Sequence, residues 1–172
     1  MVRLVKYCLA FGLIAAFAVP AFAQDDFPKF NLVPGYGNLG FGIPSFGLET
    51  KRHSGFVMDA NYNFTPVIGA DIFTGYYSLG SGGELYTNSF GGIFTLRKNA
   101  HIVPFGVASF GFGYENFLGT RAMATRIGGG VDFPFQDSLA IRFEVSRMSF
   151  HFNHDWEGSA NYSVGLVLNL SQ

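Results

Sequence analysis

The amino-acid sequence predicts an all-β protein, an eight-stranded antiparallel up-and-down transmembrane β-barrel. Three observations lead to this fold class. The only long apolar run lies at the N-terminus, so helical membrane spans of about 20 apolar residues are not expected elsewhere. Most of the remaining chain alternates apolar and polar residues with the period of a half-exposed strand. Finally, 17% of the residues are aromatic and 13% are charged, against about 25% charged residues in soluble domains.

The N-terminus has the pattern of a secretory signal peptide. Arg3 and Lys6 make its start positive, and the apolar run that follows ends in the small-x-small cleavage pattern Ala21-Phe22-Ala23. We therefore expect residues 1–23 to be a signal peptide and residues 24–172 to form one barrel domain. The single cysteine falls within the signal, so a disulfide framework is excluded for the mature chain.

Four segments make up the first half of the predicted barrel. The first, near residues 30–38, has a weak pattern and contains Pro34, which has no amide hydrogen to donate. Residues 56–63, 68–75 and 86–96 alternate clearly, and apart from Val57 and Phe73 the named side chains on one face are small or polar. Their other face consists of Phe56, Met58, Ala60, Tyr62, Ile68, Ala70, Ile72, Thr74, Tyr86, Phe90, Phe94 and Leu96.

The second half contains three regular segments, residues 122–133, 139–146 and 160–170. The last of them presents six apolar or aromatic side chains on one face and is about as long as a tilted strand that crosses a bilayer. Their apolar face consists of Met123, Ile127, Val131, Phe133, Leu139, Ile141, Phe143, Val145, Ala160, Tyr162, Val164, Leu166, Leu168 and Leu170.

The segment 102–114 is irregular, because large apolar residues lie on both of its faces. Val103, Phe105 and Val107 define one face, whereas Phe110, Phe112 and Tyr114 define the other. Two interpretations are open. Either a β-bulge near Ala108-Ser109 shifts the pattern, or the three C-terminal rings fill the interior of the barrel.

Short polar turns and longer connections separate these segments. The predicted turns are 63–66, 97–100 and 136–138, and the predicted longer loops are 39–52, 79–83, 115–120 and 151–157. Three turns and four loops join eight strands and place both chain ends on the turn side, which is periplasmic in such barrels. An aromatic outer rim is expected from Tyr36, Tyr76, Tyr86, Tyr114, Phe150 and Trp156.

A soluble barrel would also alternate, but it would turn its large apolar residues inward and its charges outward. Here the large residues continue from strand to strand, while the smaller face carries Asp, Arg and Glu. Exposure of the apolar face to lipid explains this pattern better. The formal net charge is −1 and there is no basic block, which argues against a nucleic-acid partner.

With its signal peptide, its strand count and its closing strand over residues 159–170, the chain resembles the small eight-stranded outer-membrane barrels, the OmpA-like and OmpX-like group. The resemblance implies a monomer in the outer membrane of a Gram-negative bacterium, in contact with membrane lipids and lipopolysaccharide. It also implies insertion by the outer-membrane assembly machinery. The chain departs from this group at its last strand. That strand commonly ends in an aromatic residue that the assembly machinery recognises, whereas this chain ends in Leu170-Ser171-Gln172.

The smaller face carries six charged residues, which we expect to point into the lumen. An eight-stranded barrel is so narrow that side chains fill it, and charges inside must be paired or hydrated. The main interpretation is a structural plug of ion pairs and hydrogen bonds. The alternative is a gated ion path through the same residues. The predicted lumen network consists of Asp59, Asp71, Arg126, Asp132, Arg142 and Glu144.

The predicted outer loops supply the other candidate residues, which would meet surface partners. These residues are Phe46, Lys51, Arg52, His151, His154 and Trp156. His151 and His154 with the following aspartate could suggest a metal site, but the spacing is short and lacks a second ligand cluster. No metal, cofactor or catalytic centre is therefore expected.

Three functions are consistent with these observations. The leading one is a non-enzymatic barrel that contributes to envelope integrity or surface adhesion. The second is a narrow, porin-like pore for ions or small solutes. The third and least favoured is a lipid A-modifying enzyme, for which Ser149 and His151 would supply a hydroxyl and a base, with Glu157 nearby.

Overall fold

The computed structural model describes residues 27–43, 48–80, 82–98, 101–116, 119–152 and 155–171. The predicted signal peptide, together with Phe46 and His154, lies outside the described residues. Within the ranges just given, no helix is long and apolar enough to cross a membrane.

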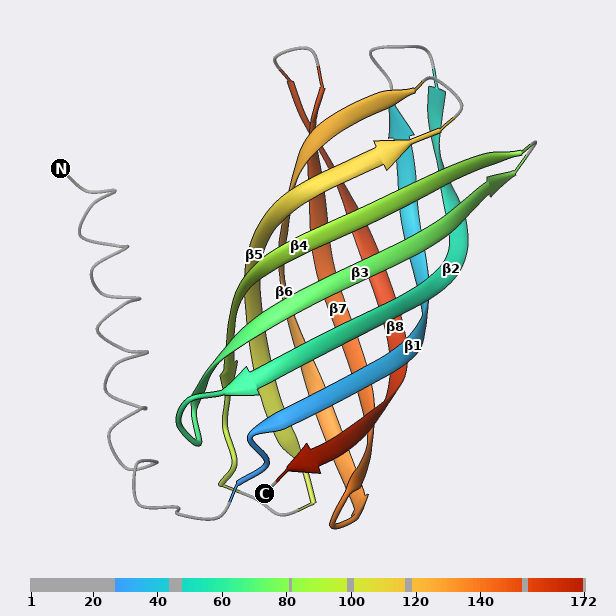
Figure 1. Ribbon diagram of the computed structural model, residues 1–172. Helices are drawn as coiled ribbons and strands as arrows, with labels where there is room; N and C mark the ends of the chain where they lie inside the picture. The colour runs from blue at the N-terminus through green and yellow to red at the C-terminus, as the bar shows by residue number, and fades with distance from the viewer. Residues whose placement is uncertain are drawn as a thin grey trace, which may run out of the picture.

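Eight strands form one closed antiparallel barrel, as predicted (Figure 1). Each strand pairs with the next along the chain, and β8 closes the barrel by pairing with β1. The strands are β1 Phe30–Ile43, β2 Leu48–Asn63, β3 Ile68–Gly80, β4 Gly83–Thr95, β5 Val103–Glu115, β6 Thr120–Gln136, β7 Leu139–Phe152 and β8 Asp155–Ser171.

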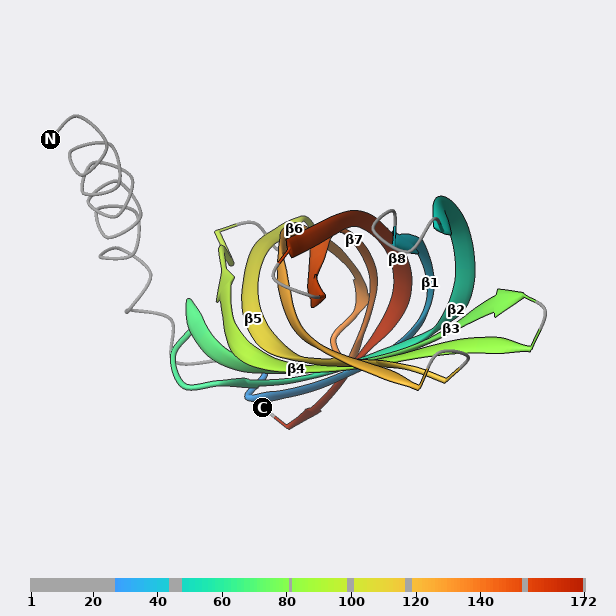
Figure 2. The ribbon, with the colours of Figure 1, turned by 90° about the horizontal axis from the view of Figure 1, so that it is seen from above.

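The described chain starts and finishes at the same end of the barrel (Figure 1). We call this end, where β2–β3, β4–β5 and β6–β7 are connected, the turn end, and the opposite end the loop end. The β3–β4 hairpin at the loop end extends away from the ring of strands (Figure 2). Gly80 and Gly82 make its tight turn with positive φ angles of 79° and 82°, which glycine adopts without steric cost.

The pleat of each strand separates two kinds of surface. Side chains that face the interior are mostly buried, while large apolar side chains cover the outside of all eight strands. Ile127, Phe110 and Phe112, for example, are 65%, 63% and 67% exposed. In water this would be a large exposed apolar surface, whereas a lipid environment covers it at no cost.

The segment 102–114, whose pattern is irregular, follows neither of the two predicted alternatives. β5 pairs with β4 and β6 in an unbroken register, so there is no bulge at Ala108-Ser109. Phe110 and Phe112 point outward, and the inner face is formed by Phe105 and Val107 with glycines at 111 and 113. Apolar residues lie on both faces because the interior at this strand is itself apolar at one end.

The predicted outer loops are shorter in the structure than expected. Residues 39–43 and 48–52 belong to β1 and β2, so most of the predicted loop 39–52 is strand. Likewise, β7 continues to Phe152 and β8 begins at Asp155. Charged and glycine-rich residues continue the strand ladders here because charged side chains beyond the bilayer can remain in water.

Buried apolar side chains cluster in the lumen toward both ends. The larger cluster lies toward the loop end and includes Leu39, Phe41, Phe73, Tyr77 and Phe150, with Phe41 and Phe150 in edge-to-face contact at 5.4 Å. Phe150 is therefore an interior residue, and its predicted place in the outer rim is wrong, because its strand presents this position inward. Smaller clusters toward the turn end consist of Val33, Ala140 and Val167 and of Ile93, Phe105 and Val107.

Two adjacent glycines of β4 occupy opposite faces of the wall. A Cβ atom on Gly91 would lie 2.0 Å from the carbonyl oxygen of Ala108 and 2.4 Å from the Cα of Ser109, both on the neighbouring β5. A Cβ atom on Gly92 would have its nearest neighbour, the carbonyl oxygen of Gly69, at 3.8 Å. The inner position therefore requires glycine, and the outer position does not.

Candidate functional site

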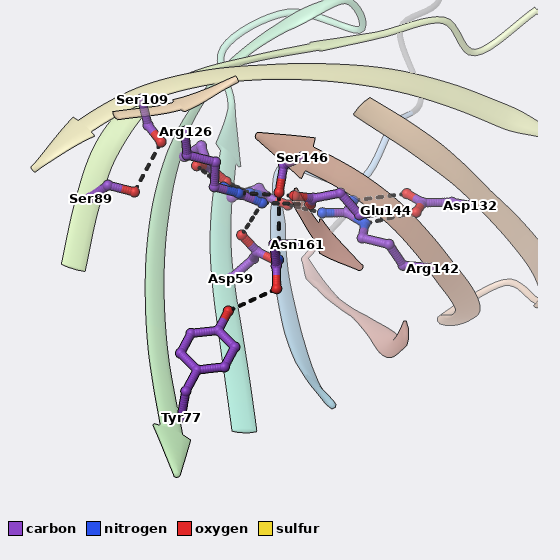
Figure 3. A network of polar contacts seen from close by, with 12 residues as sticks. Asp59, Tyr77, Ser89, Ser109, Arg126, Asp132, Arg142, Glu144, Ser146 and Asn161 are labelled. Carbon is purple, nitrogen blue, oxygen red and sulfur yellow. Dashed lines mark hydrogen bonds and ion pairs between the residues drawn. The ribbon is translucent and has the colours of Figure 1, made fainter. Parts of the chain in front are cut away.

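The centre of the lumen contains a network of charged side chains around Arg126 of β6. Its guanidinium is fully buried and contacts three carboxylates from three other strands (Figure 3). Nη2 donates to Asp59 Oδ1 of β2 at 2.9 Å, and Nη1 donates to Asp71 Oδ2 of β3 at 2.9 Å. Glu144 of β7 accepts two hydrogen bonds, from Nε at 2.9 Å and from Nη2 at 2.5 Å. Arg126 thus links opposite sides of the barrel.

A second arginine, Arg142 of β7, forms a parallel ion pair with Asp132 of β6. Nε and Nη2 donate to the two carboxylate oxygens at 2.8 and 2.9 Å. The two residues face each other directly in the β6–β7 register, so this pair is local to one ladder. Two parallel charge-assisted hydrogen bonds are the strongest arrangement for an arginine and a carboxylate.

Asn61 joins the two arginine clusters. Its side-chain amide donates to Asp71 Oδ1 at 2.8 Å, and its Oδ1 accepts from Nη1 of Arg142 at 3.0 Å. The amide therefore satisfies one group from each cluster, and the six charged residues form one continuous network. Its formal charge is −2, because two guanidiniums face four carboxylates.

Aromatic rings cover the guanidinium planes. The Phe73 ring centroid lies 4.3 Å from Cζ of Arg126, and the Phe105 centroid lies 4.2 Å from Cζ of Arg142. Cations stack on aromatic faces, and the attraction grows where water is excluded. The rings thus fix the arginines and fill space through which water could otherwise pass.

Neutral polar groups form further hydrogen bonds in the lumen beside the charged network. The Tyr77 hydroxyl donates to Asn161 Oδ1 at 3.1 Å, and the Asn161 amide reaches Ser146 Oγ at 3.5 Å (Figure 3). On the β4–β5 side, the hydroxyls of Ser89 and Ser109 lie 2.9 Å apart. Buried polar groups that find partners in this way avoid the cost of desolvation.

The structure brings all six predicted lumen residues together. The residues that the sequence did not single out are Asn61, Asn161 and Tyr77, together with the two stacking rings. Period-two alternation already placed Asn61 and Phe73 on inner faces. However, the contacts that join them to the arginines depend on which strands face each other across the lumen, and no single strand carries that signal.

The predicted outer contacts do not form a single site. Lys51 and Arg52 lie on β2, and Arg52 Nη1 donates to the carbonyl oxygens of Asn38 and Ala160 at 3.2 and 2.9 Å. His151 and Trp156 form a separate pair across β7 and β8, with ring centroids 5.1 Å apart.

The enzyme alternative finds no support in the placement of its residues. Ser149 and His151 share the outer face of β7. Glu157 pairs with Phe150 and therefore shares the inner face. A general base and its partner need hydrogen-bond contact with the nucleophile, and opposite faces of a strand prevent it. Among the described residues, no group of three His, Cys, Asp or Glu side chains could hold a metal ion.

Comparison with known proteins agrees with this architecture. The family model "Outer membrane protein beta-barrel domain" matches residues 9–169. Neisserial surface protein A has a TM-score of 0.69 at 10% identity, over 83% of this chain and 97% of its own. No match is found among curated proteins.

Two further solved structures have the same fold. The N-terminal barrel of Pseudomonas aeruginosa OprF has a TM-score of 0.54 at 14% identity, over 81% of this chain and 98% of its own. The attachment invasion locus protein Ail of Yersinia pestis has a TM-score of 0.53 at 15% identity, over 83% of this chain and 100% of its own. At these identities the likeness concerns the fold alone.

Proposed function

The chain belongs to the family of outer membrane protein β-barrel domains, and from this premise we propose that it is a sealed, non-enzymatic barrel that contributes to envelope integrity or surface adhesion. Its place is the outer membrane, where the apolar outer face meets lipid. The role of the lumen network in this proposal is structural: it fills and braces the barrel.

The observation that carries the proposal is the filled lumen. Arg126, Asp71 and Asn61 in its middle are completely buried, and so are Phe73 and Tyr77 next to them. Ion pairs and hydrogen bonds link β2, β3, β6 and β7 across the interior. A path for hydrated ions would have to break several of these contacts at once, each of them in a region that water does not reach.

We expect the refolded mature chain to produce no discrete current steps in planar lipid bilayers. Only protein with heat-modifiable gel mobility, the sign of a closed barrel, should be used. Regular steps in the wild type would instead support the pore alternative. Steps that then changed size in Glu144→Gln would assign conduction to the network.

A second measurement tests the permeability barrier of the outer membrane in living bacteria. We expect bacteria that lack the protein to take up more of a hydrophobic dye, and plasmid-borne wild type to reverse this. The doubly substituted Lys51→Ala/Trp156→Ala chain should restore the barrier equally, because neither residue contributes to the lumen. If the mutant cells keep a normal barrier but lose attachment to a surface, the adhesion role is the correct one.

A further inference from the structure

The strand pair that closes the barrel, β1 with β8, ends early at the loop end. We call this pair the seam. Its register runs as far as Leu39, which pairs with Asn161, although β1 continues to Ile43 and β8 begins at Asp155. Beyond this point each strand keeps its other neighbour, because β1 pairs with β2 up to Ile43 and β8 pairs with β7 up to the Phe152–Asp155 pair. The β1–β2 and β7–β8 hairpins are therefore separate at the top of the barrel (Figure 1).

Arg52 of β2 crosses the outside of the seam just past its last strand pair. Nη1 of Arg52 donates to the carbonyl oxygen of Asn38 on β1 at 3.2 Å and to that of Ala160 on β8 at 2.9 Å. Cζ lies 4.6 Å from the ring centroid of Tyr162, the residue of β8 that pairs with Asn38. Hydrogen bonds from a charged donor are stronger than those from a neutral one, and the ring attracts the cation further. Arg52 thus ties the β1–β2 hairpin to β8.

The guanidinium takes the place of a backbone hydrogen bond in the seam. Gly40 and Ala160 would form the next strand pair, and they are close in space, since a Cβ atom on Gly40 would lie 3.7 Å from the Ala160 carbonyl oxygen. The same Cβ atom would lie 3.8 Å from Cζ of Arg52, so the side chain covers this point. The register nevertheless ends one pair earlier. A side chain can leave this position without unpairing either hairpin.

The same two hairpins also meet on the inside of the barrel. The ring of Phe41 on β1 contacts the ring of Phe150 on β7 edge to face, with centroids 5.4 Å apart and planes at 88°. Both side chains are buried. Such an aromatic pair is stabilising beyond the area that it buries. An exposed polar contact outside and a buried apolar contact inside thus hold this part of the seam together.

We propose that the loop end of the seam opens and closes as a unit, with Arg52 as the clasp that sets this equilibrium. The opening separates the two hairpins as far as the Leu39–Asn161 pair. Each hairpin keeps its own strand pairing, so the contacts that break are those of the Arg52 and Phe41 side chains. Such a local opening requires far less free energy than unfolding of the whole barrel.

The opening leaves the centre of the barrel unchanged. Asp59 of the charged network pairs with β1 at Val33, on the turn-end side of the last pair that opens. The protein therefore combines a sealed lumen with a movable outer end, and the surface that faces the exterior has two shapes. Because the network is not involved, the proposal is tested separately from the question of whether the barrel conducts.

An introduced thiol can report the opening, because the single cysteine of the chain lies in the predicted signal peptide. Leu39→Cys places a thiol at a side chain that is 0% exposed, on the inner side of the last seam pair. Ile93→Cys places a control thiol at a residue that is 3% exposed, in a cluster toward the turn end. A charged, water-soluble maleimide reacts with a buried thiol only while its site is open, so the labelling rate in detergent micelles measures the opening.

We expect Arg52→Met to speed labelling at position 39 about tenfold, because the closed seam loses hydrogen bonds from a charged donor. Labelling at position 93 should not change. The matched control is Arg121→Met, since Arg121 is also an exposed arginine near a tyrosine ring but lies on β6. It should stay within about twofold of wild type. All variants must first show heat-modifiable mobility.

The inner contact provides a second test. Phe41→Leu removes the edge-to-face contact with Phe150 and should speed labelling at position 39 about fivefold. If both contacts close one opening, their free energies add, and Phe41→Leu/Arg52→Met should label about fiftyfold faster than wild type. A double variant that labels little faster than Arg52→Met alone would mean that the two contacts secure separate motions, which contradicts the proposal.

Three further results would overturn the proposal. Arg52→Met could leave labelling at position 39 unchanged, which would mean that Arg52 does not hold the seam. It could speed labelling at positions 39 and 93 equally, which would mean a general loss of stability. Finally, Arg121→Met could speed labelling at position 39 as much as Arg52→Met, which would assign the effect to surface charge.

Discussion

Replacing Arg126 with methionine should lower the free energy of unfolding of the barrel by about 4 kcal/mol, or prevent refolding altogether. The substitution keeps an unbranched side chain of similar length but removes the one cation that contacts Asp59, Asp71 and Glu144. Three carboxylates would then face each other in a space that water does not reach. Breaking a buried ion pair from one side is costly because the remaining charge has no compensation.

The matched control is Asp59→Asn, which neutralises the other side of one of these contacts. It leaves Arg126 with two carboxylates and reduces the negative excess of the network, so we expect a loss of no more than about 1 kcal/mol. Urea unfolding in detergent micelles, monitored by gel mobility, measures the free energy of unfolding of both variants. Equal losses in the two variants would mean that packing and not charge governs this site.

Gly91→Ala should destabilise the barrel by about 3 kcal/mol, whereas Gly92→Ala should stabilise it by about 0.5 kcal/mol. The new methyl group at position 91 would overlap the backbone of β5, with the carbonyl oxygen of Ala108 at 2.0 Å. A closed barrel cannot move one strand away without straining its neighbours. At position 92 the methyl group points outward into open space, and the gain comes from reduced backbone entropy in the unfolded chain.

The same urea titration compares the two neighbours under identical conditions. Because both substitutions are Gly to Ala on one strand, intrinsic strand preference cancels between them. If the two variants unfold at the same urea concentration, the close approach of β4 and β5 at Gly91 is not a feature of the folded protein.

Much of the barrel could be predicted from the sequence, because the pleat of a strand has a period of two. That period separated Asp59, Arg126 and Glu144 from the apolar residues beside them, and the structure places all three inside. It did not reveal that Arg126 reaches Asp59 and Asp71 across the lumen. Such contacts depend on the stagger of all strands around the ring, which the sequence of one strand does not contain.

Two errors have clear physical causes. β5 looked irregular because hydrophobicity does not distinguish its faces. Side-chain size does distinguish the two faces, since glycine occupies inner positions where rings from other strands already fill the space. A Cβ atom on Gly113, for instance, would lie 2.8 Å from Cε1 of Phe150. The ends of β1 and β2 were predicted as loop because charge and glycine were interpreted as signs of a turn, whereas strand pairing continues into water at no penalty.

The network around Arg126 also has a consequence for how the protein is made. A β2–β3 hairpin alone would bring Asp59 and Asp71 to the bilayer without the arginine that pairs with them, since Arg126 comes from β6. Half of a barrel is therefore an unfavourable species in lipid, because Asp59 and Asp71 are paired only when β6 arrives with Arg126. Insertion and ring closure are in this way coupled into one cooperative event, and an incompletely synthesised chain gains little by entering the membrane early.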